Sequence, residues 1–163
     1  PRLALGLLTY EEINLASKAQ CGKGVSKQAF YLLPKIRETE ALLRSSYSHD
    51  LNWLETHPEL CFSSFNGAMP MEDNKKTDAG FRERKTVLAR HIPARTIDRL
   101  LRDLMASMPR AQCARDDMID ALVCGVLARL DAAGRDCLPP GEQEFDEVGL
   151  PMRICYPIPT ASQ

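Results

Sequence analysis

Two sets of carboxylates are the side chains in this sequence best suited to chemistry. Glu59 follows a short run that ends at His57-Pro58, and a second set, Asp116, Asp117 and Asp120, opens a strongly apolar segment further along the chain. Carboxylate oxygens are the ligands that hard divalent cations prefer. Two such cations can activate a water molecule and stabilise the leaving oxygen of a phosphodiester. The pattern therefore predicts metal-assisted phosphoryl chemistry, provided that folding brings the two sets together.

The same acids also have a purely structural interpretation. Glu59 falls in the first turn of an expected helix, where the helix dipole stabilises a negative charge. Asp117 and Asp120 fit an N-cap followed by a first-turn acid. Asp120 is harder to explain in this way, because it stands one residue before the apolar run and should face the edge of the core.

Four further side chains are candidates for contact with a substrate. His57 is a candidate proton shuttle or substrate contact because an imidazole titrates near neutral pH, and a structural histidine at a strand end is the alternative. Lys75, Lys76 and Arg84 carry the positive charge that phosphate contacts need. Solvated lysines in a loop are the alternative interpretation.

Composition indicates a globular protein whose net charge does not favour binding to nucleic acid. The chain has 163 residues, 44% hydrophobic and 26% charged, and a net charge of −1. We expect one domain over residues 1–156 and a flexible tail over 157–163. No apolar run approaches the ~18 residues of a membrane span, and no signal-peptide layout is present, so no membrane partner and a cytoplasmic location are expected.

Charge is nevertheless distributed unevenly along the chain. Residues 75–102 contain nine basic residues and three acids, a net of +6, whereas residues 131–150 contain six acids and one arginine, a net of −5. Such asymmetry can steer a polyanion to one face, and solvated helix faces beside an acidic loop are the alternative.

Cysteine and histidine spacing argues against a zinc site. The six cysteines include no Cys-x-x-Cys pair, and none of the three histidines stands at a zinc-ligand spacing from a cysteine pair. We therefore expect reduced thiols, with Cys124 packing as a small hydrophobe inside an apolar helix.

Hydrophobic periodicity and end signals predict a helix-rich chain with two short strands. The helix that contains Asp120 is apolar around most of its girth and should be the most buried element. A capping box at Thr9 and Glu12 starts the first helix. The expected elements are helices over 9–21, 26–44 (bent at Pro34), 59–65, 78–91, about 97–108 and about 117–130, with strands over 52–57 and 152–156.

Short motifs in a specific order resemble the predicted RNase H-like nucleases of bacteria and archaea, and they run over nearly the whole chain. They are Thr9-Tyr10-Glu11-Glu12 with Asn14, Gly24 to Ala29, Leu33 to Glu38, His57-Pro58-Glu59, Phe65-Asn66-Gly67, Lys75-Lys76-Thr77 with Gly80 and Glu83-Arg84, Asp117 to Leu122, and Gly149 to Ile154.

The resemblance implies an α/β fold, of which this chain would be the helix-rich C-terminal portion with few strands. It also implies a nuclease that hydrolyses phosphodiester bonds with Mg²⁺ or Mn²⁺. Glu59 and Asp120 match the metal ligands, with Asp117 or Asp116 as catalytic support. A non-catalytic domain that binds nucleic acid or protein on the same scaffold is the alternative.

One departure from the family carries its own expectation. Members begin with a strand that carries a metal-binding Asp, upstream of the position of Pro1. The chain is therefore expected to be inactive by itself. It is also expected to expose an apolar surface at Leu122, Val126 and Leu130, which either the N-terminal segment or another copy of the chain would cover.

Overall fold

The structure, a computed structural model, describes residues 6, 9–45, 52–109 and 113–159. The chain divides into two compact units, Pro1–Trp53 and Leu54–Gln163, where the sequence predicts one domain over 1–156. The boundary falls just ahead of the segment that carries Glu59, so all predicted site residues belong to the second unit. In the described residues, no helix combines the length and apolar character needed to cross a bilayer.

Helices α2 (Tyr10–Cys21) and α3 (Lys27–Leu43) form the described part of the first unit. The predicted capping box is confirmed: the Thr9 hydroxyl accepts from the backbone N–H of Glu12, and the Glu12 carboxylate accepts from the N–H of Thr9. α2 ends where Gly22 takes a left-handed conformation, and Ser26 caps α3. Helix α3 continues through Pro34, as its apolar period predicts.

Polar contacts fix the corner between α2 and α3. The Asn14 side chain accepts a hydrogen bond from the N–H of Val25 at 2.9 Å, and the Tyr10 hydroxyl donates to the Val25 carbonyl at 2.9 Å. Among the described residues of this unit, Ile13 is the one buried hydrophobic side chain, and α3 buries none. Hydrogen bonds therefore define this unit more than an apolar core does.

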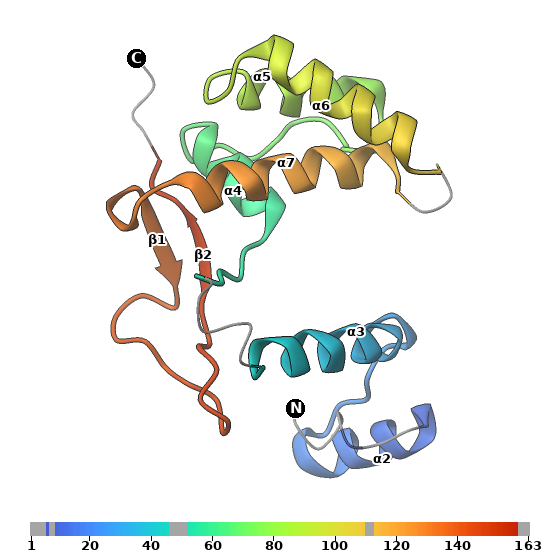
Figure 1. Cartoon of the computed structure of the whole chain (residues 1–163). Coiled ribbons are helices and arrows are strands. Elements are labelled where there is room, and N and C mark those ends of the chain that lie inside the picture. The colour runs from blue at the N-terminus through green and yellow to red at the C-terminus, as the bar shows by residue number, and fades with distance from the viewer. Residues whose placement is uncertain (1–5, 7–8, 46–51, 110–112, 160–163) are drawn as a thin grey trace. The chain divides into compact units, whose positions relative to one another are not determined.

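The second unit is built around α7 (Arg115–Arg129), which packs against α4 (Pro58–Phe65), α5 (Asp78–Leu88) and α6 (Ala94–Ser107), as Figure 1 shows. Helix α7 contributes more buried residues than any other described helix, as its apolar girth predicts. The buried core comprises Cys61, Phe62, Phe65, Val87, Leu88, Ile97, Leu101, Met118, Ile119, Val123, Val126 and Leu127.

The prediction of an exposed apolar surface on α7 is wrong. Val126 is only 8% exposed, and Leu122 and Leu130 are partly buried against the same core. The reason is that α4, α5 and α6 already cover this side of the helix. The exposed positions of α7 include the small residues Ala121, Gly125 and Ala128 instead.

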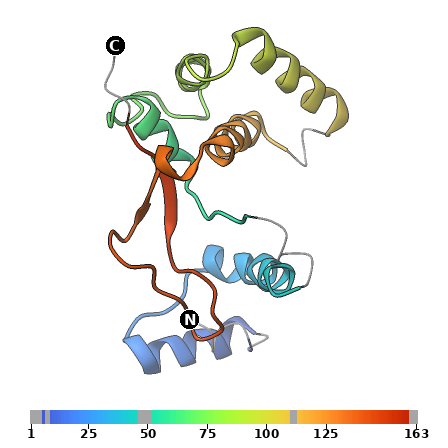
Figure 2. The ribbon, with the colours of Figure 1, turned by 60° about the vertical axis from the view of Figure 1, so that its left-hand side comes forward.

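The sheet of this unit is an antiparallel pair, β1 (Arg135–Leu138) and β2 (Ile154–Pro157), which run side by side in Figure 2. A short 3-10 turn at Ala132–Gly134 leads from α7 into β1, and β2 packs against α4. Strand β1 was not predicted. The predicted final strand forms as β2, and Pro157 belongs to it and is buried, so the flexible tail does not begin there. Residues 160–163 of that tail lie outside the described residues.

The strand predicted over 52–57 is also wrong. In that stretch Thr56 alone makes a β-bridge, parallel to Cys155, because the chain turns into α4 at Pro58. Two hydrogen bonds hold it: the N–H of Cys155 donates to the Glu55 carbonyl, and the Thr56 hydroxyl donates to the Cys155 carbonyl, both at 2.7 Å. The helix predicted over 78–91 ends at Leu88, where a turn begins.

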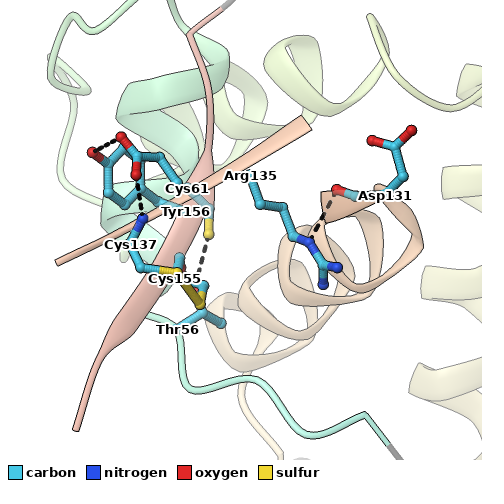
Figure 3. Close-up of a disulfide and its surroundings, with 8 residues drawn as sticks. Thr56, Cys61, Asp131, Arg135, Cys137, Cys155 and Tyr156 are labelled. Carbon is cyan, nitrogen blue, oxygen red and sulfur yellow. Dashed lines mark hydrogen bonds between the residues drawn. A yellow bond between two sulfur atoms is a disulfide. The ribbon is translucent and has the colours of Figure 1, made fainter. Parts of the chain in front are cut away.

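The expectation of reduced thiols fails for one pair. Cys137 and Cys155 stand opposite each other in the β1–β2 register and form a disulfide (Figure 3). Their pairing depends on β1, which spacing along the sequence does not reveal. Cys21, Cys61, Cys113 and Cys124 are free thiols. Burial raises the pKa of Cys124 to about 11, as expected for a cysteine that packs in an apolar helix.

Candidate functional site

Glu59 lies in the first turn of α4, directly after Pro58. Proline suits this position because its missing N–H needs no partner there. The helix turns Cys61, Phe62 and Phe65 into the core and leaves the Glu59 side chain 36% exposed at the edge. The apolar face of α4 therefore fixes the direction in which this carboxylate points.

Arg84, on α5, forms a bidentate ion pair with Glu59. Its Nε and Nη2 atoms donate to Oε1 at 3.2 and 3.0 Å, and Nη2 also donates to Oε2 at 2.9 Å. Nη1 donates to the backbone carbonyls of Asp73 and Gly80 at 3.0 and 3.1 Å. These five contacts match the five N–H donors of a guanidinium. Arg84 is 3% exposed, so it holds Glu59 and the loop at Asp73 in place and has no donor left for a phosphate.

The loop at residues 72–77 is fastened to α5 at several further points. The Glu83 carboxylate accepts from the N–H groups of Glu72 and Asp73 at 2.8 and 3.1 Å. Thr77 caps α5 by accepting from the N–H of Gly80. A Cβ atom at Gly80 would lie 2.1 Å from the Asn74 carbonyl oxygen, so this close approach requires glycine. The loop is therefore rigidly placed beside the first turns of α5.

Lys75, at the centre of that loop, reaches Asp120 on α7. The distance from Nζ to Oδ2 is 2.6 Å, and the two side chains are 33% and 14% exposed. The pKa of Lys75 is raised, first by this hydrogen bond and then by the negative charges of Asp120, Glu59 and Asp116, against the opposing effect of burial. Both sets of carboxylates singled out in the sequence thus act on one ammonium group.

The second oxygen of Asp120 is distinctive. Oδ1 is buried and has no hydrogen-bond partner among the described residues. A buried carboxylate oxygen without a partner is costly, because it has lost its water and gained no donor in return. Such an oxygen is of the kind that a divalent cation takes as a ligand.

The other predicted site residues lie in simpler surroundings. Asp117 is exposed and accepts from the N–H of Ala114 at 3.0 Å, so it caps α7 from the third helical position, whereas the sequence suggested Asp117 itself as the N-cap residue. His57 is exposed at the N-cap position of α4, and its side chain makes no capping hydrogen bond. Lys76 is exposed, and its backbone N–H donates to the Asn74 side chain.

The two predicted metal ligands differ in their fit to a cation. Asp120 offers Oδ1, whereas both oxygens of Glu59 are engaged by Arg84. Over the described ranges, no group of three or more His, Cys, Asp or Glu side chains is placed to hold a metal ion. Asp120 therefore has one oxygen free for a metal, although its other oxygen is held by Lys75, whereas Glu59 would have to exchange a contact with Arg84 first.

Sequence reasoning missed the residues that build the loop. Glu83, Asn74 and Gly80 were not predicted as site residues, yet they fix the loop that carries Lys75 and Lys76 against α5. The signal was present in the spacing of Lys75-Lys76-Thr77, Gly80 and Glu83-Arg84, which we used for the family resemblance and as a source of positive charge, but not as a structural motif. In the structure, Glu83 and Arg84 on α5 hydrogen-bond to the backbone of the 72–77 loop, and Thr77 caps α5; we call this set of contacts the clamp.

Comparison with known proteins identifies a family. No curated protein and no solved structure matches the chain. One family model, described as "Protein of unknown function (DUF429)", matches residues 1–144, which include α2 to α7 and the whole of the Glu59, Arg84, Lys75 and Asp120 cluster. The chain therefore belongs to the DUF429 family.

Proposed function

We propose that this chain is a nuclease domain of the RNase H-like class, which hydrolyses phosphodiester bonds of nucleic acid with Mg²⁺ or Mn²⁺. The observation that carries the proposal is the convergence at Lys75. Glu59 on α4 and both Asp116 and Asp120 on α7 act on the same ammonium group, although α4 and α7 are far apart in the sequence. The resemblance of the sequence motifs to that class supplies the reaction.

Each residue of the cluster has a role in this proposal. Asp120 is the principal metal ligand through its unpartnered oxygen, and Glu59 is the second, oriented by Arg84. A bound metal would supply Lewis acidity and an activated water molecule. Lys76 offers exposed positive charge to phosphates, and the exposed His57, two residues before Glu59, is the candidate for proton transfer. Asp117 supports this arrangement by fixing the start of α7.

Cleavage of labelled nucleic acid tests the proposal. Joined to an upstream segment that carries the metal-binding Asp of the resembled family, the chain should cut single- or double-stranded DNA or RNA in the presence of Mn²⁺ or Mg²⁺. Asp120→Asn in this extended chain should lower the rate at least ~100-fold, the scale of losing a group that contacts the reacting centre. Asp103→Asn, an exposed acid on α6, is the matched control and should leave the rate unchanged. Absence of cleavage by the extended chain, or equal rates in it and in its Asp120→Asn variant, would contradict a nuclease.

A second function is favoured by the pairing of the two carboxylates. Arg84 neutralises Glu59 and Lys75 neutralises Asp120, which is the arrangement expected of a scaffold that binds nucleic acid or a protein without turnover. The same assay separates the two functions. Retention of labelled nucleic acid with no metal-dependent product would support the binding domain.

A further inference from the structure

Asp120 is the carboxylate on which a cation and a lysine would compete. Its Oδ2 atom accepts from Lys75 Nζ at 2.6 Å, and its Oδ1 atom is buried with no partner in the described part of the chain. The side chain is 14% exposed, so the charge of Asp120 is balanced chiefly by this ammonium group. Removal of the ammonium would leave a largely buried and uncompensated charge.

Lys75 is not an ordinary surface lysine, because its backbone is fixed. The Arg84 guanidinium holds the carbonyl of Asp73, the Glu83 carboxylate holds the N–H of Asp73, and Gly80 lets α5 approach the carbonyl of Asn74. After Lys75, the Thr77 hydroxyl accepts from the N–H of Gly80, so the loop is fastened on both sides of Lys75 and presents it in a defined place. The clamp thus directs a single positive charge at Asp120.

The ammonium group of Lys75 lies in a region of negative charge. The ammonium group is subject to the negative charges of Asp120, Glu59 and Asp116 together. A divalent cation bound to Asp120 would be attracted by negative charge of the kind that acts on the ammonium group and would be repelled by Lys75. The ammonium and the metal therefore exclude each other at this carboxylate.

We propose that Lys75 is a built-in counter-ion of Asp120, which a divalent cation displaces, and that the displaced ammonium then contacts a phosphate of the nucleic acid. The inference rests on the proposed function and deepens it, because it makes metal binding and nucleic-acid binding cooperative. Linkage requires the coupling to be reciprocal: the cation strengthens binding of the polyanion by the same factor as the polyanion strengthens binding of the cation.

Titration calorimetry with Mn²⁺ alone tests the competition. Lys75→Met should bind Mn²⁺ about fivefold more tightly than the wild-type chain, the scale of one partly exposed ion pair. Lys76→Met is the matched control, because it removes the same charge from the neighbouring exposed residue, and its affinity should stay near that of the wild type. Equal or weaker Mn²⁺ binding by Lys75→Met, compared with Lys76→Met, would overturn the proposal.

Two further variants keep the test independent of folding and of the proposed function. Lys75→Gln retains a hydrogen-bond donor for Asp120 and should also bind Mn²⁺ more tightly. Lys75→Met combined with Asp120→Asn should lose the gain. If neither Lys75 substitution changes Mn²⁺ binding, the counter-ion role of Lys75 is contradicted but the proposed function is not. If no variant binds Mn²⁺, the metal-dependent function is contradicted as well.

The coupling itself is measured with a short single-stranded oligonucleotide. In the wild-type chain, saturating Mn²⁺ should tighten oligonucleotide binding at constant ionic strength, and in Lys75→Met this tightening should disappear. Equal tightening in both chains would show that the ammonium group does not pass from Asp120 to a phosphate.

Discussion

At the scale of single residues, Arg84 holds Glu59 and the 72–77 loop at once. Arg84→Lys should lower the free energy of unfolding by about 2 kcal/mol, because an ammonium cannot reproduce the bidentate contact with Glu59 and loses the side-chain hydrogen bond to the Asp73 carbonyl. Urea unfolding measures this loss. Arg82→Lys, an exposed position on the same helix, should change stability by less than ~0.5 kcal/mol. Similar losses in both variants would refute the role assigned to Arg84.

His91 makes stability depend on pH. Burial, and then the charge of Arg90, lower the pKa of this imidazole, whose ring centroid lies 3.9 Å from that of Phe65. The unfolded chain therefore binds the proton at a higher pH than the folded chain does, and stability should fall as pH drops below ~6.5. Urea unfolding at pH 7 and pH 5 should show a smaller loss for His91→Gln than for the wild type. His57→Gln, an exposed control, should lose as much as the wild type does.

Residue types in the sequence identified the acids and bases of the cluster but not their partners. The sequence alone was enough to single out Glu59, Asp120, Lys75 and Arg84, because it shows which charged residues stand next to apolar runs. The pairing of Arg84 with Glu59 and of Lys75 with Asp120 was not predicted. It depends on how α4, α5 and α7 pack, so both bases were interpreted as phosphate contacts.

At the scale of elements, two glycines inside helices should respond in opposite ways to the same substitution. Gly80→Ala should destabilise the chain by about 1–3 kcal/mol, because the added methyl group would meet the backbone of Asn74. Gly125→Ala should stabilise it by about 0.5–1 kcal/mol, since nothing lies within 4 Å and alanine favours the helix. Thermal or urea unfolding of both variants measures the two signs. A stabilising Gly80→Ala would show that the loop can move away from α5.

The helices were more predictable than the strands for a physical reason. Helix α6 carries its apolar residues at helical intervals, and Thr9 and Ser26 are N-cap residues that mark the starts of α2 and α3. Local sequence is therefore enough to predict these helices. β1 is four residues long, and its partner lies across a loop, so no local period marks it. The 52–57 segment looks extended, but it finds one pairing position only, at Thr56.

At the scale of the whole molecule, the basic segment has one exposed stripe. Arg95, Arg99 and Arg102 follow each other at helical spacing on α6 and are exposed, whereas the Asp98 carboxylate is paired with Lys85. Replacing the three arginines by glutamine should weaken binding of single-stranded DNA. It should also make the slope of log K against log salt shallower by about 2.

A control for this prediction keeps the loss of charge but moves it to the first unit. Lys18, Lys23 and Lys27 are exposed, and their replacement by glutamine removes the same three charges. The salt slope of that variant should stay near the wild-type value. Equal flattening in both triple variants would mean that nucleic acid responds to net charge and not to a surface on α6.

The disulfide has a mechanical consequence. It closes a ring in the chain between Cys137 and Cys155, eighteen residues apart in sequence. A force that pulls the two ends apart would pass from β2 directly to β1 through the two sulfur atoms, so the acidic segment inside the ring would carry no load. About 60 Å of extended chain would stay hidden from a stretching experiment until a reducing agent opened the ring.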